Sequence, residues 1–187
     1  MKTLRLILGD QLNVSHSWLD QVDDDHIYLM AEMRQETDYV KHHIQKVVGF
    51  FQSMRNFSNT LQDEGHHVEY FKIGDQNNPQ NLPDLIEQAI SNHKIEKFEY
   101  QLPDEYRLDQ QLQEICESTS IPSEAFDTEH FYTNRDELEN HFEGKKQLLM
   151  ESFYRMMRKK HDILMENDQP EGGKWNFDQS NRKKWDG

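Results

Sequence analysis

The sequence predicts a three-layer αβα domain of the Rossmann-like class, with a five-stranded, mainly parallel sheet in the strand order 3-2-1-4-5. Short apolar runs alternate along the chain with longer stretches of helical periodicity. Strands that are separated by helices need crossover connections, which make neighbouring strands parallel and cover both faces of the sheet. A chain of 187 residues is long enough to bury a core of this kind.

Five apolar runs have the length and composition of β-strands. Several of them are rich in aromatic or β-branched residues, which favour strands. The runs are Leu4–Leu8, His26–Met33, His67–Ile73, Lys97–Leu102 and, most weakly, Ser123–Thr128.

The longest predicted helix covers Asp38–Glu64, between the second and third strands. Thr37 or Asp38 can cap its start, and Gly65 can end it in a left-handed conformation. Its apolar residues recur every three or four positions and are expected to face the core. These residues are Val40, Ile44, Val47, Val48, Phe51, Met54, Phe57 and Leu61.

Two further helices are predicted over Leu82–His93 and Pro103–Ser118, each with a proline near its first turn. After Thr128 the pattern changes to a short helix over Asn134–Gly144 and a longer one over Gln147–Asn167. The apolar residues expected to face inward from the longer helix are Leu149, Phe153, Met156, Met157, Ile163 and Leu164.

Three segments therefore make up the predicted domain organisation. Residues 1–130 form the α/β domain, and residues 131–166 form a helical extension packing on it. Residues 167–187 contain two adjacent glycines and almost no periodicity, which is typical of a linker.

The charge of the chain is uneven. Asp plus Glu is 35 and Lys plus Arg is 21, a formal net charge of −14, which is unfavourable for binding a polyanion over the whole surface. Residues 1–143 carry a net −17, whereas residues 144–187 carry a net +3. The acidic body is thus followed by a mildly basic tail.

The single cysteine, Cys116, excludes an internal disulfide and any multi-cysteine metal or iron–sulfur site formed by these residues alone. No apolar run approaches the roughly 18 residues of a membrane span, and the first residues lack the core of a signal peptide. We therefore expect a cytoplasmic protein.

The candidate binding site lies where the predicted strands end. In a sheet of this order, ligands bind at the carboxyl ends of strands one and four, where the winding direction reverses. Strand one leads into Gly9, Asp10, Gln11 and Leu12, strand two into Glu32, and strand four into Asp104. Gly9 permits a close backbone approach, and Asp10 and Gln11 can hydrogen-bond to a flat heteroaromatic ring or a polyol.

Neighbouring helices add side chains to the same edge. Tyr39 is available for stacking, His43 and Lys46 follow it on the long helix, and Tyr106 lies with Asp104 at the other lip of the cleft. A purely structural interpretation is also open for the strand-end residues. In that interpretation Asp10 caps the segment around Ser15–Trp18, and Glu32 pairs with an arginine.

Several site classes are disfavoured. The stretch after strand one has one glycine where a dinucleotide-binding loop has three, and no P-loop motif is present, which argues against NAD and ATP. His42–His43 and His66–His67 are adjacent pairs whose side chains point in different directions, so neither pair can chelate one ion. We therefore expect no metal site.

The basic tail suggests a second function. Arg155, Arg158 and Lys159 are predicted on one side of a helix beside aromatic and methionine residues, a pattern compatible with a surface for nucleic acid or a partner domain. The alternative is an ordinary amphipathic helix with a solvated basic face. An acidic body makes weak nucleic-acid binding at best the expectation.

Three segments together resemble the deoxyribodipyrimidine photolyase-related proteins, a bacterial branch of the photolyase/cryptochrome superfamily that contains iron–sulfur (6-4) photolyases and cryptochromes. They are LRLILGDQL (Leu4–Leu12), EYQLPDEYRLD (Glu99–Asp109) and FYRMMRKKHDILMENDQPEGGKWNFDQSNRK (Phe153–Lys183). The resemblance spans essentially the whole chain, and the pattern P-x-G-G-K-W-N-F-D-x-x-N-R-K is its most specific part.

The resemblance implies the N-terminal α/β domain of a two-domain flavoprotein that acts in light-dependent DNA repair or blue-light sensing. In such proteins this domain binds an antenna, 6,7-dimethyl-8-ribityllumazine, in a pocket at the strand ends. A helical C-terminal domain holds FAD, a [4Fe–4S] cluster and most of the DNA-binding surface. The sequence stops at Gly187, before those sites, so the chain alone is not expected to repair DNA.

Carried over residue by residue, the resemblance places ten positions at the antenna pocket. They are Gly9, Asp10, Gln11, Leu12, Glu32, Tyr39, His43, Lys46, Asp104 and Tyr106. The alternative function is a nucleic-acid or partner-binding module with no bound chromophore. A nucleotide-binding enzyme of the same fold class is a third possibility, which the missing glycine pattern disfavours.

Overall fold

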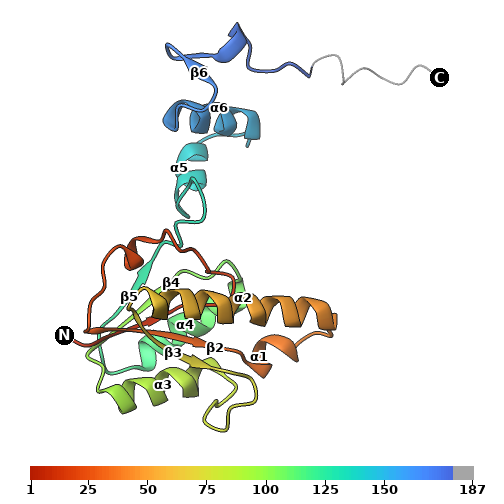
Figure 1. The fold of residues 1–187 in the computed structure, drawn as a ribbon. Coiled ribbons are helices and arrows are strands. Elements are labelled where there is room, and N and C mark those ends of the chain that lie inside the picture. The colour runs from red at the N-terminus through yellow and green to blue at the C-terminus, as the bar shows by residue number, and fades with distance from the viewer. Residues whose placement is uncertain (179–187) are drawn as a thin grey trace. The chain divides into compact units, whose positions relative to one another are not determined.

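A computed structural model describes residues 1–178 (Figure 1). The chain divides into two compact units, the first covering Met1–His130 and the second beginning at Phe131. Each unit is described by itself below.

The first unit contains a five-stranded parallel sheet in the order β3-β2-β1-β4-β5, which confirms the predicted fold class. The central strand β1 pairs with β2 on one side and with β4 on the other, so that Leu4 lies opposite both Ile27 and Phe98. Their carboxyl ends therefore meet at one edge of the sheet. The strands are β1 Thr3–Leu6, β2 His26–Ala31, β3 His67–Phe71, β4 Lys97–Gln101 and β5 Ser123–Phe126.

Helices cover both faces of this sheet, as the alternating pattern predicted. Apolar residues of α3 (Leu82–His93) and α4 (Tyr106–Ser118) pack with Leu4, Leu6 and Phe98 in one core cluster. Residues of α2 (Ile44–Asp63) pack with Tyr28 and Met30 in a second cluster on the other face. The short 3-10 helix η1 (Ser17–Leu19) adds Trp18 to that second cluster.

The prediction of one helix over Asp38–Glu64 is wrong at the start of the helix. A one-turn helix α1 (Arg34–Thr37) ends at Thr37, the chain then turns, and α2 begins only at Ile44. His43 caps α2, because its imidazole Nδ1 accepts a hydrogen bond from the backbone N–H of Gln45 at 3.2 Å. The end was predicted correctly, since Gly65 follows α2 with a φ of 95°.

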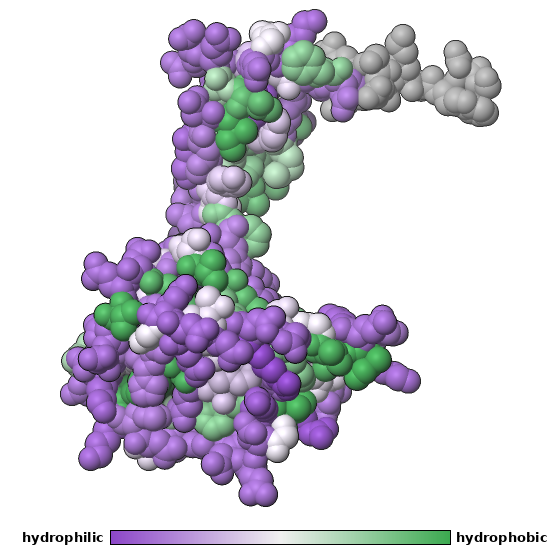
Figure 2. Space-filling view, viewed as in Figure 1, coloured by the Kyte–Doolittle hydropathy of each residue, from purple (hydrophilic) through white to green (hydrophobic). Residues whose placement is uncertain are grey.

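The apolar stripe expected to face the core does so only in the second half of α2. Met54, Phe57 and Leu61 are buried, whereas Val40, Ile44 and Val48 are exposed. The amino-terminal end of α2 extends past the strands, and Figure 2 shows a hydrophobic patch there. A periodic stripe is buried only along the length of helix that lies over the sheet.

The second unit is made of short elements: α5 (Glu137–Phe142), α6 (Met150–Lys160), β6 (Met165–Glu166), β7 (Gln169–Pro170) and the 3-10 helix η2 (Glu171–Gly173). The helix predicted over Gln147–Asn167 thus ends at Lys160, and β6 and β7 form a small antiparallel hairpin after it. Leu149, Ile163 and Leu164, which were expected to face inward, are exposed.

The predicted linker, residues 167–187, begins inside that hairpin, and residues 179–187 lie outside the described part of the chain. Among residues 1–178, no helix is both long and apolar enough to cross a membrane.

Candidate functional site

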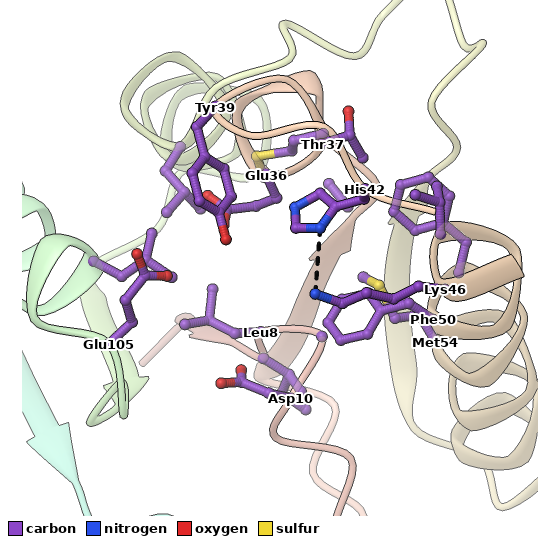
Figure 3. Close-up of a pocket in the computed structure, with 18 of the residues that line it drawn as sticks. Leu8, Asp10, Glu36, Thr37, Tyr39, His42, Lys46, Phe50, Met54 and Glu105 are labelled. Atoms are coloured by element: carbon purple, nitrogen blue, oxygen red, sulfur yellow. Dashed lines mark hydrogen bonds between the residues drawn. The ribbon is translucent and has the colours of Figure 1, made fainter. Parts of the chain in front are cut away.

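A cavity of about 210 Å³ opens at the carboxyl ends of β1 and β2 in the first unit (Figure 3). Its floor is formed where the two strands end, by Leu6, Ile7, Leu8, Ala31 and Met33. One wall comes from α2, through Val47, Phe50, Phe51 and Met54. Leu82 and Leu108, at the starts of α3 and α4, close the apolar part. This edge is where a sheet of this strand order is expected to bind ligands.

Gly9 is required for the shape of this wall. A Cβ atom built on Gly9 would lie 2.8 Å from Cζ of Phe50 and 2.9 Å from Sδ of Met54. Such distances are well inside normal carbon contacts of about 3.5–4.0 Å. The absence of a side chain at position 9 therefore lets α2 pack directly onto the end of β1.

Polar side chains form the rim of the cavity. Asp10, Glu36, Tyr39, Lys46 and Glu105 surround its open centre in Figure 3. Lys46 Nζ lies 3.3 Å from Nδ1 of His42, which also lines the cavity. The rim thus combines three carboxylates with an ammonium, an imidazole and a phenol.

Arg107, on α4, links the two sides of the rim. Its guanidinium donates to Oε2 of Glu36 at 2.8 Å and to Oε1 of Glu105 at 2.9 Å. It also lies over the ring of Tyr39, 4.9 Å from the ring centroid. One cation therefore neutralises part of the acidic rim and fixes the position of an aromatic ring at the mouth.

Glu36 retains an unused acceptor at the cavity. Its Oε2 accepts from Arg107, but its Oε1 is buried and accepts no hydrogen bond from any residue among 1–178. A buried carboxylate oxygen without a donor is costly, and an N–H or O–H group placed in the cavity would satisfy it.

Asp10 occupies an electrostatically unfavourable position. Although the residue is exposed, nearby protein atoms restrict the hydration of its carboxyl, and this desolvation raises the pKa of Asp10 above its ordinary value. The carboxylates of Asp104 and Glu105 add to the rise, whereas a backbone hydrogen bond and His130 oppose it. Asp10 is therefore easier to protonate than a free aspartate.

A second, more open cavity of about 550 Å³ lies beside the first. Gly9, Asp10 and Phe50 line both cavities, and Leu12 lines only the second. The remaining residues of the second cavity are Asn13, Ser53, Glu129 and His130.

Of the ten residues predicted to bind a cofactor, the structure brings four to the first cavity. They are Gly9, Asp10, Tyr39 and Lys46. Tyr39 was expected on the long helix, but it lies in the turn between α1 and α2, which places it over the mouth. Leu12 lines the second cavity, and the other five residues line neither.

Gln11 points into the protein, with only 2% of its surface exposed. Its Oε1 accepts from the backbone N–H of Leu8 at 2.9 Å, and its Nε2 donates to the carbonyl of Gln101 at 3.1 Å. The amide thus fixes the turn after β1 to the end of β4. Gln11 holds the site in shape and does not line it.

Glu32 is fully buried, with 0% of its surface exposed, and lines neither cavity. Arg55 donates to both carboxylate oxygens, at 2.5 and 2.8 Å, and Tyr70 Oη and the backbone N–H of Ile73 donate at 2.8 and 3.0 Å. Desolvation opposes ionisation, but these donors outweigh it and hold the pKa of Glu32 below its ordinary value. The structural interpretation, pairing with an arginine, is the one observed.

The remaining three residues predicted to bind a cofactor line neither cavity. His43 is the cap of α2, Tyr106 is exposed at the start of α4, and Asp104 acts on Asp10 only through its charge. Asp10 does not cap the segment around Ser15–Trp18, because His16 accepts from the backbone N–H of Trp18.

The basic residues of α6 are brought together, but mostly by contacts within the second unit. Arg155, Arg158 and Lys159 all lie over the ring of Trp175, at 5.4, 5.2 and 5.7 Å from its centroid. Arg158 is buried and donates to the carbonyls of Ile163 and Leu164, and Arg155 pairs with Glu151. Lys159 is exposed and Arg158 is buried, and the predicted role of the three residues in binding nucleic acid stays a prediction.

Comparison with known proteins identifies the family. A family model described as deoxyribodipyrimidine photo-lyase-related protein matches residues 5–187. The chain belongs to this family.

This photolyase-related chain is similar to two relatives of different length. It is 35% identical, over 184 residues, to a (6-4) photolyase of Agrobacterium fabrum, an alignment that covers 98% of this chain but 36% of the relative. It is 24% identical, over 193 residues, to uncharacterized protein R852 of Acanthamoeba polyphaga mimivirus, covering 98% of this chain and 95% of the relative. The chain thus spans little more than a third of the photolyase.

The most informative site residues of this photolyase-related chain, Glu36 and Arg107, were not predicted from the sequence. Glu36 was missed because the predicted helix started at Asp38 and gave no reason to inspect α1. Arg107 lies within the matched segment Glu99–Asp109, and its position three residues after Asp104 was a usable signal. Within residues 1–178, no group of three or more His, Cys, Asp or Glu side chains is arranged to hold a metal ion.

Proposed function

We propose that the first unit holds a flat antenna chromophore, 6,7-dimethyl-8-ribityllumazine, in the cavity at the ends of β1 and β2. The observation that carries the proposal is an apolar slot whose polar rim retains a buried, unsatisfied acceptor on Glu36. When bound, such a chromophore absorbs light and passes the excitation energy to a flavin.

The residues present fit this class of ligand. The apolar side chains of the floor and of α2 can contact the two faces of a ring system, as ligand pockets generally do. The ring edge of a lumazine carries an imide N–H and carbonyl oxygens. Glu36 Oε1 can accept from the N–H, and Lys46 can donate to a carbonyl.

An antenna site needs rigid positioning and no acid–base chemistry from the protein. Arg107 supplies rigidity by joining Glu36, Glu105 and Tyr39 across the mouth. Gln11 and Glu32 add to it, since each fixes the end of a strand through several hydrogen bonds. No nucleophile is required, and none of the rim residues has to change its covalent state.

For the whole protein, the family suggests a flavoprotein active in light-dependent DNA repair or blue-light sensing. In this proposal FAD, a [4Fe–4S] cluster and the main DNA-binding surface belong to a further domain, and residues 1–187 alone are not catalytic. DNA is then a partner of the complete protein, in the cytoplasm. The engagement of Arg155 and Arg158 within the second unit weighs against an independent nucleic-acid-binding module.

Titration with the lumazine tests the proposal. Purified protein should show saturable binding with altered lumazine fluorescence, and Glu36→Gln should weaken binding by about 10-fold to 100-fold, because a hydrogen bond to a charged acceptor is lost. Glu87→Gln, at an exposed position on α3, is the matched control and should bind as the wild type does. Unchanged emission at high micromolar ligand, with protein shown to be folded by circular dichroism, would refute the proposal.

A further inference from the structure

One side of the first cavity is formed by the stretch of chain that joins β2 to α2. Residues 34–43, the mouth segment, comprise α1 and the turn that follows it. Figure 3 shows Glu36, Tyr39 and His42 on this side of the cavity, which all three line. A ligand in the first cavity therefore lies against the mouth segment.

The mouth segment is firmly anchored at its beginning. The side-chain Oε1 of Gln80 accepts from the backbone N–H of Arg34 at 3.1 Å, and the Gln80 carbonyl accepts from the N–H of Gln35 at 3.3 Å. The Gln35 amide accepts from the backbone N–H of Leu82 at 3.0 Å and donates to Gln111 at 2.6 Å. These contacts tie the first two residues of the segment to the start of α3 and to α4.

The rest of the segment buries little apolar surface. Tyr39 is 57% exposed and Val40 is 48% exposed, and Ile44, which follows the segment as the first residue of α2, is 68% exposed. A stretch with few buried apolar contacts opens locally at a low free-energy cost, and the covers of binding sites are drawn from such stretches. The turn after α1 is therefore easier to displace than the sheet and the helices beside it.

Arg107 holds this weakly packed stretch against α4. Its guanidinium donates to Oε2 of Glu36 at 2.8 Å and lies 4.9 Å from the ring centroid of Tyr39. It also donates to Oε1 of Glu105, the residue that precedes α4, at 2.9 Å. The Arg107 side chain is 38% exposed, so solvent screens these ion pairs and each stabilises the closed position only modestly. Such contacts favour closure and still break readily.

The volume of the first cavity indicates that the closed position has to relax when a ligand enters. The cavity measures about 210 Å³, whereas pockets for small molecules and cofactors measure about 300–1,000 Å³. Its floor consists of strand ends that are buried in the core, such as Leu6, Ile7 and Met33. The mouth segment is exposed, so it is the side that can move outward.

We propose that the mouth segment is a hinged cover and that Arg107 is its latch: the cover swings away from α4 to admit the chromophore and closes over the bound ring. This inference rests on the proposed function. Arg107 does not line the cavity, so it is a positioning residue that acts through Glu36 and Tyr39. Opening breaks its contacts in the empty and in the loaded protein alike.

Stopped-flow mixing with 6,7-dimethyl-8-ribityllumazine tests the latch. Arg107→Ala removes the same contacts from the empty and the loaded closed forms. The association and dissociation rate constants should therefore both rise by about fivefold to thirtyfold, while Kd changes by less than about threefold. Arg107→Lys keeps the charge without the planar fork, so its rates should lie between those of the wild type and of Arg107→Ala.

Arg34→Ala is the matched control, because it makes the same change within the mouth segment. The Arg34 side chain is exposed and pairs with Asp38 of the same segment at 3.7 Å. Its removal should leave both rate constants unchanged, and circular dichroism should show that all three variants are folded.

Amide hydrogen exchange of the ligand-free protein tests the hinge without the chromophore. In Arg107→Ala the backbone amides of residues 36–42 should exchange about fivefold to thirtyfold faster than in the wild type, whereas those of α3 should exchange at the wild-type rate. Arg34→Ala should match the wild type over residues 36–42.

The outcomes separate this inference from the proposed function. If Arg107→Ala accelerates dissociation but leaves association unchanged or slower, Arg107 behaves as an ordinary contact of the site, and the latch is refuted while chromophore binding stands. The latch is equally refuted if exchange over residues 36–42 stays at the wild-type rate, or if Arg34→Ala accelerates binding as much as Arg107→Ala does. If the lumazine does not bind the wild type, the proposed function fails and the cover for a chromophore fails with it.

Discussion

Replacing Glu32 by glutamine distinguishes a residue that supports the fold from one that binds ligand. Glu32 accepts four hydrogen bonds, two from Arg55 and one each from Tyr70 and the backbone of Ile73. A glutamine in the same position has one acceptor oxygen, and its NH₂ group would face two of these donors. About two hydrogen bonds to a charged group are lost.

The expected cost follows from that count. Hydrogen bonds to charged groups contribute about 1.5–3 kcal/mol each, and the lower value applies here because the Arg55 side chain is 39% exposed, so the loss of two lowers the free energy of unfolding by about 3 kcal/mol. This agrees with the lower end of the range of about 3–5 kcal/mol for breaking a buried ion pair. For a chain of this size we expect the melting temperature to fall by about 6–12 °C.

The pH dependence gives the assay its specificity. Because the folded protein holds the pKa of Glu32 below its ordinary value of 4.5, the stabilisation is present above that pH and is lost as the pH falls through the folded-state pKa. Glutamine does not titrate. The difference in melting temperature between wild type and Glu32→Gln should therefore be full at pH 7 and should shrink below about pH 4.5.

Thermal unfolding followed by circular dichroism from pH 7 to pH 3 measures both effects, with Glu87→Gln as the exposed control. A variant that melts within 1 °C of the wild type but loses lumazine binding would show that Glu32 is a ligand residue. A large difference that stays constant down to pH 3 would refute the argument from charge.

Three other changes test neighbouring parts of the structure. Gly9→Ala should cost about 1–3 kcal/mol of stability and weaken lumazine binding, because the new methyl group displaces Phe50; urea unfolding and titration measure the two effects. Asp10→Asn should slightly raise the free energy of unfolding at pH 7, since desolvation raises the pKa of Asp10, and this gain should vanish below about pH 3.8, where aspartate is protonated in both states. Arg158→Ala should lower the free energy of unfolding of the second unit by about 2 kcal/mol, whereas Lys159→Ala should change it by less than about 0.5 kcal/mol; amide hydrogen exchange across residues 150–170 compares them, and equal effects would contradict the assigned burial.

The sheet was predictable from the sequence because its central strands β1, β2 and β4 are mostly buried, whereas β5, the run predicted most weakly, is largely exposed. A parallel strand covered on both faces reads as a short apolar run, and the structured strands begin and end within two residues of those runs. The start of α2 was not predictable in this way. Val40 and Ile44 continue the helical spacing but are exposed, and spacing alone does not say where a helix leaves the sheet.

The sequence predicted the location of the cavity, at the carboxyl ends of the strands, but not which side chains line it. Gly9, Asp10 and Gln11 are consecutive, and all three were expected at the ligand. The backbone turn directs the Asp10 carboxylate to the cavity and the Gln11 amide into the protein. Adjacent residues in a turn can point in opposite directions, and neither composition nor spacing predicts the conformation of the turn.

The same limit applies to the basic residues of α6. Arg158 and Lys159 are adjacent and equally charged, yet Arg158 is buried by carbonyl contacts and Lys159 is exposed. Arginine is suited to the buried position because its planar guanidinium offers several donors in a fixed geometry. The sequence therefore predicted that both residues are basic. The contacts of Arg158 with the carbonyls after α6 determine that only Lys159 of the two is exposed to solvent.

Gly9 connects the fold and the proposed site more directly than any charged residue. The missing side chain lets Phe50 and Met54 pack on the end of β1, which stabilises the attachment of α2 to the sheet. The same contact places the Phe50 ring at the border between the two cavities, both of which it lines. A substitution that restored stability by moving α2 outward would open this partition. Stability and chromophore binding should consequently change together at position 9, whereas at Glu36 binding should change without an equal loss of stability.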